Sequence, residues 1–136
     1  MNSLLKSIYS IRRGPESSSI WRLAPTLGVM DDFRTLLGQL LETLAASNGG
    51  YSASMVARAL AGSDAELETF LRSNDLWGGA GSIADQGFIE GPSEVRLRGM
   101  RAMVALGNLQ IERGVTNVRT EMWVRTFEKW LRDGVV

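Results

Sequence analysis

Ser93–Arg113 reads SEVRLRGMRAMVALGNLQIER, and this stretch decides the fold. On a helix with about 3.6 residues per turn, four of its polar side chains share roughly a quarter of the circumference, and nearly everything outside that arc is apolar. The four are Arg98, Arg101, Asn108 and Glu112. A helix that is apolar on most sides is buried on most sides. Gly99 and Gly107 each lower helix propensity by about 1 kcal/mol relative to Ala, which indicates that neighbouring elements approach closely there. We therefore expect 93–113 to be the central helix of a bundle.

Other segments flank this helix with amphipathic patterns. The spacing of apolar residues predicts helices over 31–47, 52–61, 63–74 and 118–133, and a short helix over 4–11. Asn48-Gly49-Gly50 is typical of a helix stop, and Ser52 and Asn117 are expected N-caps. Ser63 and Glu66 match a capping box.

The fold class follows from these patterns. No segment alternates with period two, so strands are not expected. We expect an all-α single domain over 1–136, a bundle of about five helices with 93–113 at its centre. We expect residues 1–29 to be a partly irregular N-terminal segment packed on 30–136, in which Ile20, Trp21 and Leu23 could pin it to the core.

Composition excludes several kinds of chemistry. The chain has no Cys and no His, which removes thiolate chemistry, the commonest general base and the commonest transition-metal ligand. We expect no cofactor and no metal, since any metal ion would need oxygen ligands alone. No apolar run reaches membrane-spanning length, so a cytoplasmic protein without membrane contact is expected.

Charge is unevenly distributed although the formal net charge is zero. Residues 31–94 carry ten acids against three bases, residues 95–136 eight bases against four acids, and residues 1–30 four bases against one acid. An acidic middle can mark an interaction surface, or the segments can neutralise one another in the fold. Arginines 96, 98, 101, 113 and 119 could bind nucleic acid, but zero net charge and the acidic middle favour a solvated helix face, so no nucleic-acid partner is expected.

The segment with the most unusual composition is the glycine-rich loop over 76–87, LWGGAGSIADQG. Backbone N–H groups of Gly78, Gly79, Gly81 and Ser82 could converge on an anion, with a short helix over 82–86 behind them. It lacks the Lys of a phosphate-binding Walker motif and follows no strand. The alternative, which the sequence favours, is a tight turn between helices in which Ser82 caps and Asp85 bonds nearby backbone.

Individual side chains around this loop also suggest roles. Asp75 and Asp85 could form a carboxylate pair for acid–base or hard-metal chemistry, although solvated loop acids are commoner. Ser82 has no visible base, so nucleophilic catalysis is not expected. Trp123 and Trp130 lie on an apolar helix face and are assigned to the core, whereas Trp77 is retained as a contact residue for a ligand or partner.

Two amides on the central helix are assigned to support of the loop. Gln110 falls inside the apolar arc, where a buried amide must find partners or cost about 1–3 kcal/mol. We expect Gln110 to bond loop backbone between 75 and 87, unless it is a solvated residue at the edge of the bundle. Asn108 is assigned to the same supporting role.

Ser73–Gln86, SNDLWGGAGSIADQ, resembles a signature of small bacterial proteins that have no assigned activity. Leu106–Gln110 (LGNLQ), Asn117–Thr120 (NVRT) and Trp123 belong to the same pattern. The resemblance implies that the loop and the last two helices form one structural unit, and it transfers no chemistry. Proteins of this kind are often immunity or antitoxin-like partners.

We therefore expect a non-enzymatic bacterial protein-interaction module. It would be an immunity-type protein that binds a toxin encoded nearby through its acidic middle. The alternative is a small-ligand or anion-binding domain that uses the loop Gly78–Ser82.

Overall fold

The computed structural model describes the backbone of residues 25–47, 50–86, 88 and 92–134. Within this part the helices are α3 (Pro25–Ala46), α4 (Gly50–Ala61), α5 (Asp64–Leu71), α6 (Ile83–Gln86), α7 (Ser93–Arg113) and α8 (Thr120–Asp133). No strand occurs among these residues, which confirms the all-α prediction. The helix expected over 4–11 and the pinning residues Ile20, Trp21 and Leu23 lie outside the described residues.

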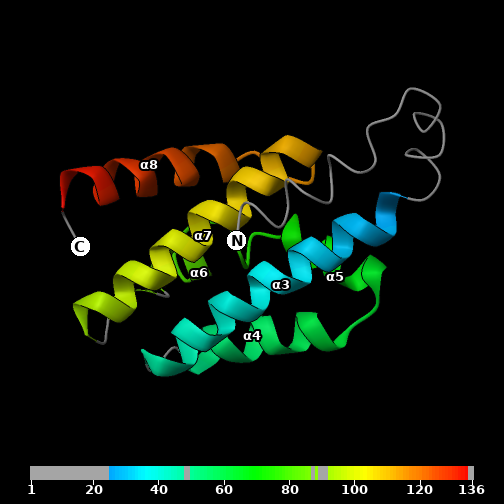
Figure 1. Cartoon of the computed structure of the whole chain (residues 1–136), viewed down its shortest axis with the longest axis horizontal. Coiled ribbons are helices and arrows are strands. Elements are labelled where there is room, and N and C mark those ends of the chain that lie inside the picture. The colour runs from blue at the N-terminus through cyan, green and yellow to red at the C-terminus, as the bar shows by residue number, and fades with distance from the viewer. Residues whose placement is uncertain (1–24, 48–49, 87, 89–91, 135–136) are drawn as a thin grey trace.

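The central position of α7 is confirmed. It crosses the bundle between α3 and α8 and packs against both, while α4 packs against the other side of α3 (Figure 1). The predicted bounds of α7 are correct, and Gly114 ends the helix in the left-handed conformation with φ of 74°. The polar arc emerges at the surface, because Arg98, Arg101 and Glu112 are exposed.

Three predicted helix starts were wrong. α3 begins at Pro25, six residues before the predicted residue 31. Proline is well tolerated in the first turn of a helix, because its missing N–H is not needed there. α4 begins at Gly50, so Ser52 is a buried residue inside the helix and not an N-cap. α8 begins at Thr120, and Asn117 does not cap it.

The capping box before α5 is confirmed. The Glu66 backbone N–H donates to Ser63 Oγ at 3.2 Å, and the Ser63 N–H donates to Glu66 Oε1 at 2.7 Å. The bond from the Ser63 backbone N–H to the carboxylate, and after it the contact with the Ser63 side chain, lower the pKa of Glu66 below its ordinary value of 4.5, because they favour the ionised form. α5 then ends at Leu71, earlier than the expected residue 74.

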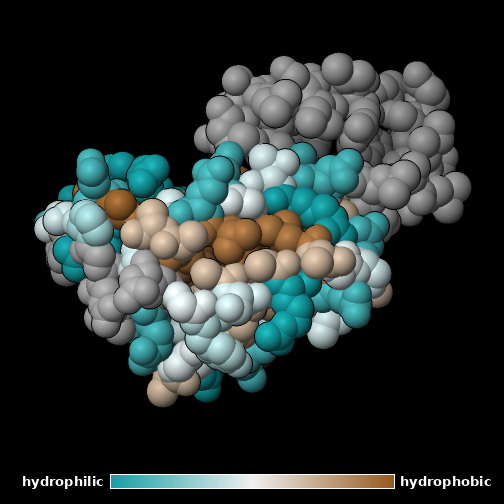
Figure 2. Space-filling view, turned by 90° about the horizontal axis from the view of Figure 1, so that it is seen from below, coloured by the Kyte–Doolittle hydropathy of each residue, from teal (hydrophilic) through white to brown (hydrophobic). Residues whose placement is uncertain are grey.

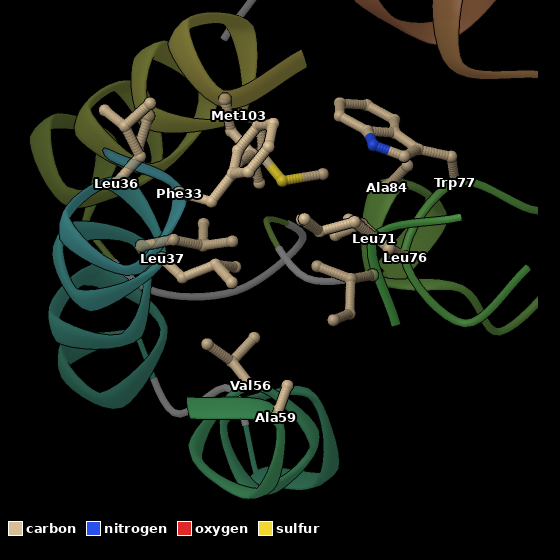
Figure 3. Packing of buried hydrophobic residues seen from close by; sticks show 14 of the residues in the cluster. Phe33, Leu36, Leu37, Val56, Ala59, Leu71, Leu76, Trp77, Ala84 and Met103 are labelled. Carbon is tan, nitrogen blue, oxygen red and sulfur yellow. The ribbon is translucent and has the colours of Figure 1, made fainter. Parts of the chain in front are cut away.

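A single hydrophobic core joins the helices. Phe33 and Leu37 of α3 point toward Met103 of α7, while Val56 of α4 and Leu71 of α5 close the core from other sides (Figure 3). All five side chains are fully buried. Burial of each such side chain contributes about 1.5–3 kcal/mol, so this core is the main source of stability.

The glycines of α7 lie where other elements approach. A Cβ at Gly107 would collide with Val124 of α8 and would lie 3.0 Å from the Trp77 ring. A Cβ at Gly99 would collide with Phe88 and lie 3.2 Å from the Thr43 hydroxyl of α3. The expected close approach is confirmed at both positions, and it offsets the low helix propensity of glycine.

Aromatic rings fill the space between α7 and α8. Phe127 has its ring centroid 5.4 to 6.3 Å from those of Trp77, Phe88, Trp123 and Trp130. Trp123 and Trp130 pack against the core as expected. Offset and edge-on pairs at these separations add about 0.5–1.5 kcal/mol each beyond area burial.

The surface is polar with an apolar band across one face (Figure 2). Leu41 of α3 and Leu60 of α4 are half-buried residues that pack against the core from outside. None of the described helices is long and apolar enough to cross a membrane.

Candidate functional site

The glycine-rich loop has a fixed backbone course between α5 and α6. The Ile83 N–H donates to the Asp75 carbonyl at 2.8 Å, and the Ala84 N–H donates to the Leu76 carbonyl at 3.1 Å. Gly78 is required, since a Cβ there would collide with the Asn74 carbonyl oxygen. Gly81 is required for a different reason, because its φ of 89° suits residues without a side chain.

Gln110 of α7 holds this loop by hydrogen bonds. Its side chain is fully buried, and Oε1 accepts a 2.7 Å hydrogen bond from the Trp77 indole. Nε2 donates to the carbonyls of Leu71 at 2.8 Å and Val115 at 2.7 Å. The predicted burial of Gln110 and its predicted contact with the loop are confirmed. The predicted hydrogen bonds to loop backbone between 75 and 87 were wrong, because Oε1 accepts from the Trp77 side chain and Nε2 donates to Leu71 and Val115, which lie outside that range.

Asn117 holds the loop from the α7–α8 connection. Its Nδ2 lies within hydrogen-bond distance of three carbonyls, those of Arg72 at 3.2 Å, Ser73 at 3.0 Å and Trp77 at 2.9 Å. Its Oδ1 accepts the Arg119 N–H at 2.7 Å. This role is not visible in the sequence, because an asparagine just before a helix fits an N-cap equally well.

Trp123 adds a third attachment. Its indole N–H donates to the Gly78 carbonyl at 2.8 Å, from the first turns of α8. Trp77 itself is fully buried, so its assignment as a contact residue for a ligand or partner is corrected to a core anchor of the loop. Inside the core, the indole N–H of Trp77 donates to Gln110. The loop is thus joined to α7 by a buried polar group and to α8 by a half-buried one.

The expected turn chemistry is present at the end of the loop. Ser82 Oγ accepts the Asp85 N–H at 3.2 Å, and Asp85 Oδ2 accepts the Gly81 N–H at 3.0 Å. The Asp85 carboxylate thereby occupies one donor of the anion nest that the sequence suggested. Ser82 is buried and has this capping role.

Asn108 does not support the loop, contrary to expectation. Its Nδ2 donates to Glu128 Oε2 at 3.2 Å, and its Oδ1 accepts from Arg125 at 3.3 Å, both on α8. The polar arc of α7 turns Asn108 toward solvent and α8 and away from the loop. The hydrogen bond from Asn108, and after it the one that Arg125 Nη1 donates to Glu128 Oε1 at 2.9 Å, lower the pKa of Glu128 below its ordinary value of 4.5.

The outer side of the loop forms an exposed surface with the α7–α8 connection. We call it the loop face, and it consists of Gly79, Ala80, Gly81, Val118, Arg119 and Met122. Val118 is 95% exposed and Met122 52% exposed, so two apolar side chains of this face are open to water. A Cβ at Gly79 would lie 2.9 Å from Arg119 Nη1, so the guanidinium lies against this glycine.

Much of the acidic middle is engaged within the fold. Asp64 pairs with Arg34 at 2.9 Å, and Glu68 pairs with Arg72 at 3.1 Å. Asp32 lies 3.7 Å from Arg113, which connects the acidic segment to the basic C-terminal one. Asp75 remains exposed. In the described ranges, no group of three or more acidic side chains is arranged to hold a metal ion.

Comparisons with known proteins give no relative for this arrangement. No protein-family model, curated protein or solved structure matches the chain. Function is therefore inferred from the geometry of the loop face and of the residues that hold it, Gln110, Asn117 and Trp123.

Proposed function

We propose that the protein is a non-enzymatic protein-interaction module of the immunity or antitoxin kind, and that its partner docks on the loop face. The observation that carries this proposal is the pair of exposed apolar side chains, Val118 and Met122, beside exposed glycine backbone. Neither side chain belongs to the hydrophobic core or to the residues packed against it. They favour a surface that a partner covers.

Rigidity of the loop face supports the same proposal. Gln110, Asn117 and Trp123 hold the loop and the α7–α8 connection through buried or half-buried hydrogen bonds. A surface that is ordered before binding loses less conformational entropy when it binds. Glycines at 79 and 81 leave the backbone open to close approach by a partner.

Charge has a smaller role than the sequence alone indicated. Asp64, Glu66 and Glu68 are engaged in pairs or caps, so they offer less attraction to a basic toxin. Exposed Asp75 is the remaining acid of the loop. Such a charge at the rim would raise the association rate with a basic partner more than the affinity.

The test is binding to the product of the adjacent gene, together with rescue of that product's toxicity. Val118→Asp with Met122→Asp places charge in the proposed interface and should weaken binding by about 10-fold or more. Tyr51→Asp is the matched control, because Tyr51 is 70% exposed but lies on α4. Binding that survives the double change would contradict docking on the loop face, whether or not the control variant binds. Absence of both binding and rescue would remove the immunity role.

A second candidate function is anion or small-ligand binding at Gly78–Ser82. The observation that favours it is Arg119, a cation without an ion-pair partner among the described residues, lying against Gly79. A thermal-shift screen with phosphate, nucleotides and carboxylates tests it, since a ligand at 100 times its Kd adds about 2.7 kcal/mol. Arg119→Gln should abolish such a shift, whereas Arg58→Gln on α4 should leave it unchanged. No shift with any of these compounds would exclude this candidate.

A further inference from the structure

Five methionines lie in the described part of the chain, and one of them differs from the rest in exposure. Met122 is 52% exposed, whereas the other four are at most 7% exposed. Those four belong to the hydrophobic core, and they are Met30, Met55, Met100 and Met103. An oxidant dissolved in water therefore reaches the Met122 sulfur in the folded protein, and it reaches the core sulfurs only after the fold opens.

The lone pairs of the Met122 sulfur are available for reaction. The Thr126 hydroxyl, one turn further along α8, lies 2.9 Å from the Met122 carbonyl oxygen and 3.9 Å from the Met122 sulfur. A hydroxyl has a single hydrogen to donate, and a thioether is only a weak acceptor. The hydroxyl hydrogen is therefore donated to the carbonyl, and the sulfur keeps its lone pairs for an electrophile.

We propose that Met122 is a modification site at which hydroperoxides oxidise the thioether to the sulfoxide. The sulfur lone pair attacks one peroxide oxygen, so an S–O bond forms as the O–O bond breaks. The sulfur gives up an electron pair, and the other peroxide oxygen takes up that pair and the peroxide proton and leaves as water or an alcohol. A methionine sulfoxide reductase reverses the step, because thiols reduce the sulfoxide to the thioether and are themselves oxidised to a disulfide, with release of water.

Oxidation changes the chemistry of the loop face and leaves the core intact. Met122 is neither in the hydrophobic core nor among the residues packed against it, so the oxidised chain should keep the midpoint temperature of thermal unfolding of the untreated chain. The sulfoxide adds a polar oxygen to the face that also carries Val118, and a polar oxygen that is buried without a donor opposes binding.

The regulatory consequence rests on the proposed function. If a partner docks on the loop face, oxidation of Met122 in the unbound chain closes that face to the partner. A partner that is already bound covers the same sulfur and protects it from the oxidant. The redox state of one side chain thus controls the association and not the fold.

Mass spectrometry of the full chain tests the modification site itself. Cleavage by trypsin after Lys and Arg places every methionine on a separate peptide, and Met122 lies on residues 120–125. The chain is treated with hydrogen peroxide for increasing times, and fragment ions locate the added oxygen on Met122 or on the neighbouring Trp123. We expect Met122 to be oxidised at least about 10-fold faster than Met103 in the folded chain. In urea the two rates should become equal, because both sulfurs are then exposed.

Affinity for the product of the adjacent gene tests the consequence. A chain oxidised at Met122 and separated from the peroxide should bind about 10-fold more weakly than the untreated chain, and reductase treatment should reverse the loss. In Met122→Leu, peroxide treatment should not change the affinity of the variant, whatever its starting value. Met55→Leu is the matched control, because it removes a buried sulfur with little change of volume and should lose affinity on treatment as the parent does.

The outcomes separate the modification site from the proposed function. Equal oxidation rates of Met122 and Met103 in the folded chain would overturn the modification site, with or without a partner. Selective oxidation with unchanged affinity would overturn the closing of the loop face, and so would a lower midpoint of thermal unfolding in the oxidised chain. Failure of the untreated chain to bind the adjacent gene product counts against the proposed function alone, because the oxidation rates decide the modification site without it.

Discussion

Gln110→Leu tests whether the buried amide network holds the loop. The substitution removes the acceptor of the Trp77 indole and the donor to the Leu71 and Val115 carbonyls. An unsatisfied buried polar group costs about 1–3 kcal/mol, so three such groups cost about 3–9 kcal/mol. Burial of leucine in place of the amide returns about 2 kcal/mol. Since the loop can partly relax toward water, we expect a net destabilisation of about 2–4 kcal/mol.

Urea unfolding followed by circular dichroism measures this loss as a difference in the free energy of unfolding. Gln39→Leu is the matched control, because it makes the same chemical change at an exposed position of α3 and should stay within about 0.5 kcal/mol. Combining Gln110→Leu with Trp77→Phe removes the orphaned indole donor, so the double variant should be less destabilised than the sum by about 1–2 kcal/mol. A Gln110→Leu variant as stable as the parent would refute the reasoning, because leucine would then be the better residue in an apolar site.

Further substitutions test other contacts. Gly107→Ala drives a Cβ into the α8 side chain packed there and should destabilise by about 1–3 kcal/mol, whereas Gly38→Ala, with open space around it, should stabilise by about 0.5–1 kcal/mol in the same unfolding assay. Asn117→Asp replaces a donor with a charge that faces three carbonyls, so the free energy of unfolding should fall by about 1–3 kcal/mol. The midpoint temperature of thermal unfolding should fall with it. An unchanged midpoint would contradict the role of this amide. The pKa of Glu128 lies below 4.5, so its stabilisation is present above that pH and lost as pH falls through the lowered pKa. NMR titration should show this, and Asn108→Ala should bring the pKa back toward 4.5; an unmoved pKa would exclude the Asn108 bond as its main cause.

The local code of the sequence determined the helices. A helix needs only its own apolar periodicity and turn residues to be recognised, and the bounds of α7 and the Ser63–Glu66 capping box were predicted from residues close in the chain. Three helix starts were predicted wrongly, because Pro25, Ser52 and Asn117 each fit more than one position at a helix terminus. The competing positions differ in tertiary contacts and not in local propensity.

The composition of the loop was also visible in the sequence, but its function was not. Gly78–Ser82 indicated a special backbone, and the capping by Ser82 and Asp85 followed from residues three or four positions apart. By itself the sequence thus determined an all-α chain, a buried central helix and a turn that needs glycine.

Only the tertiary structure decided which residues support the loop and which face solvent. Gln110 and Trp77 are 33 residues apart, and Asn117 and Trp77 are 40 apart, so no local pattern could pair them. Packing of α7 between α3 and α8 turned Trp77 inward, Asn108 toward α8 and Val118 into solvent. Such choices depend on burial and hydrogen-bond satisfaction summed over the whole fold, which the order of residues along one helix does not specify.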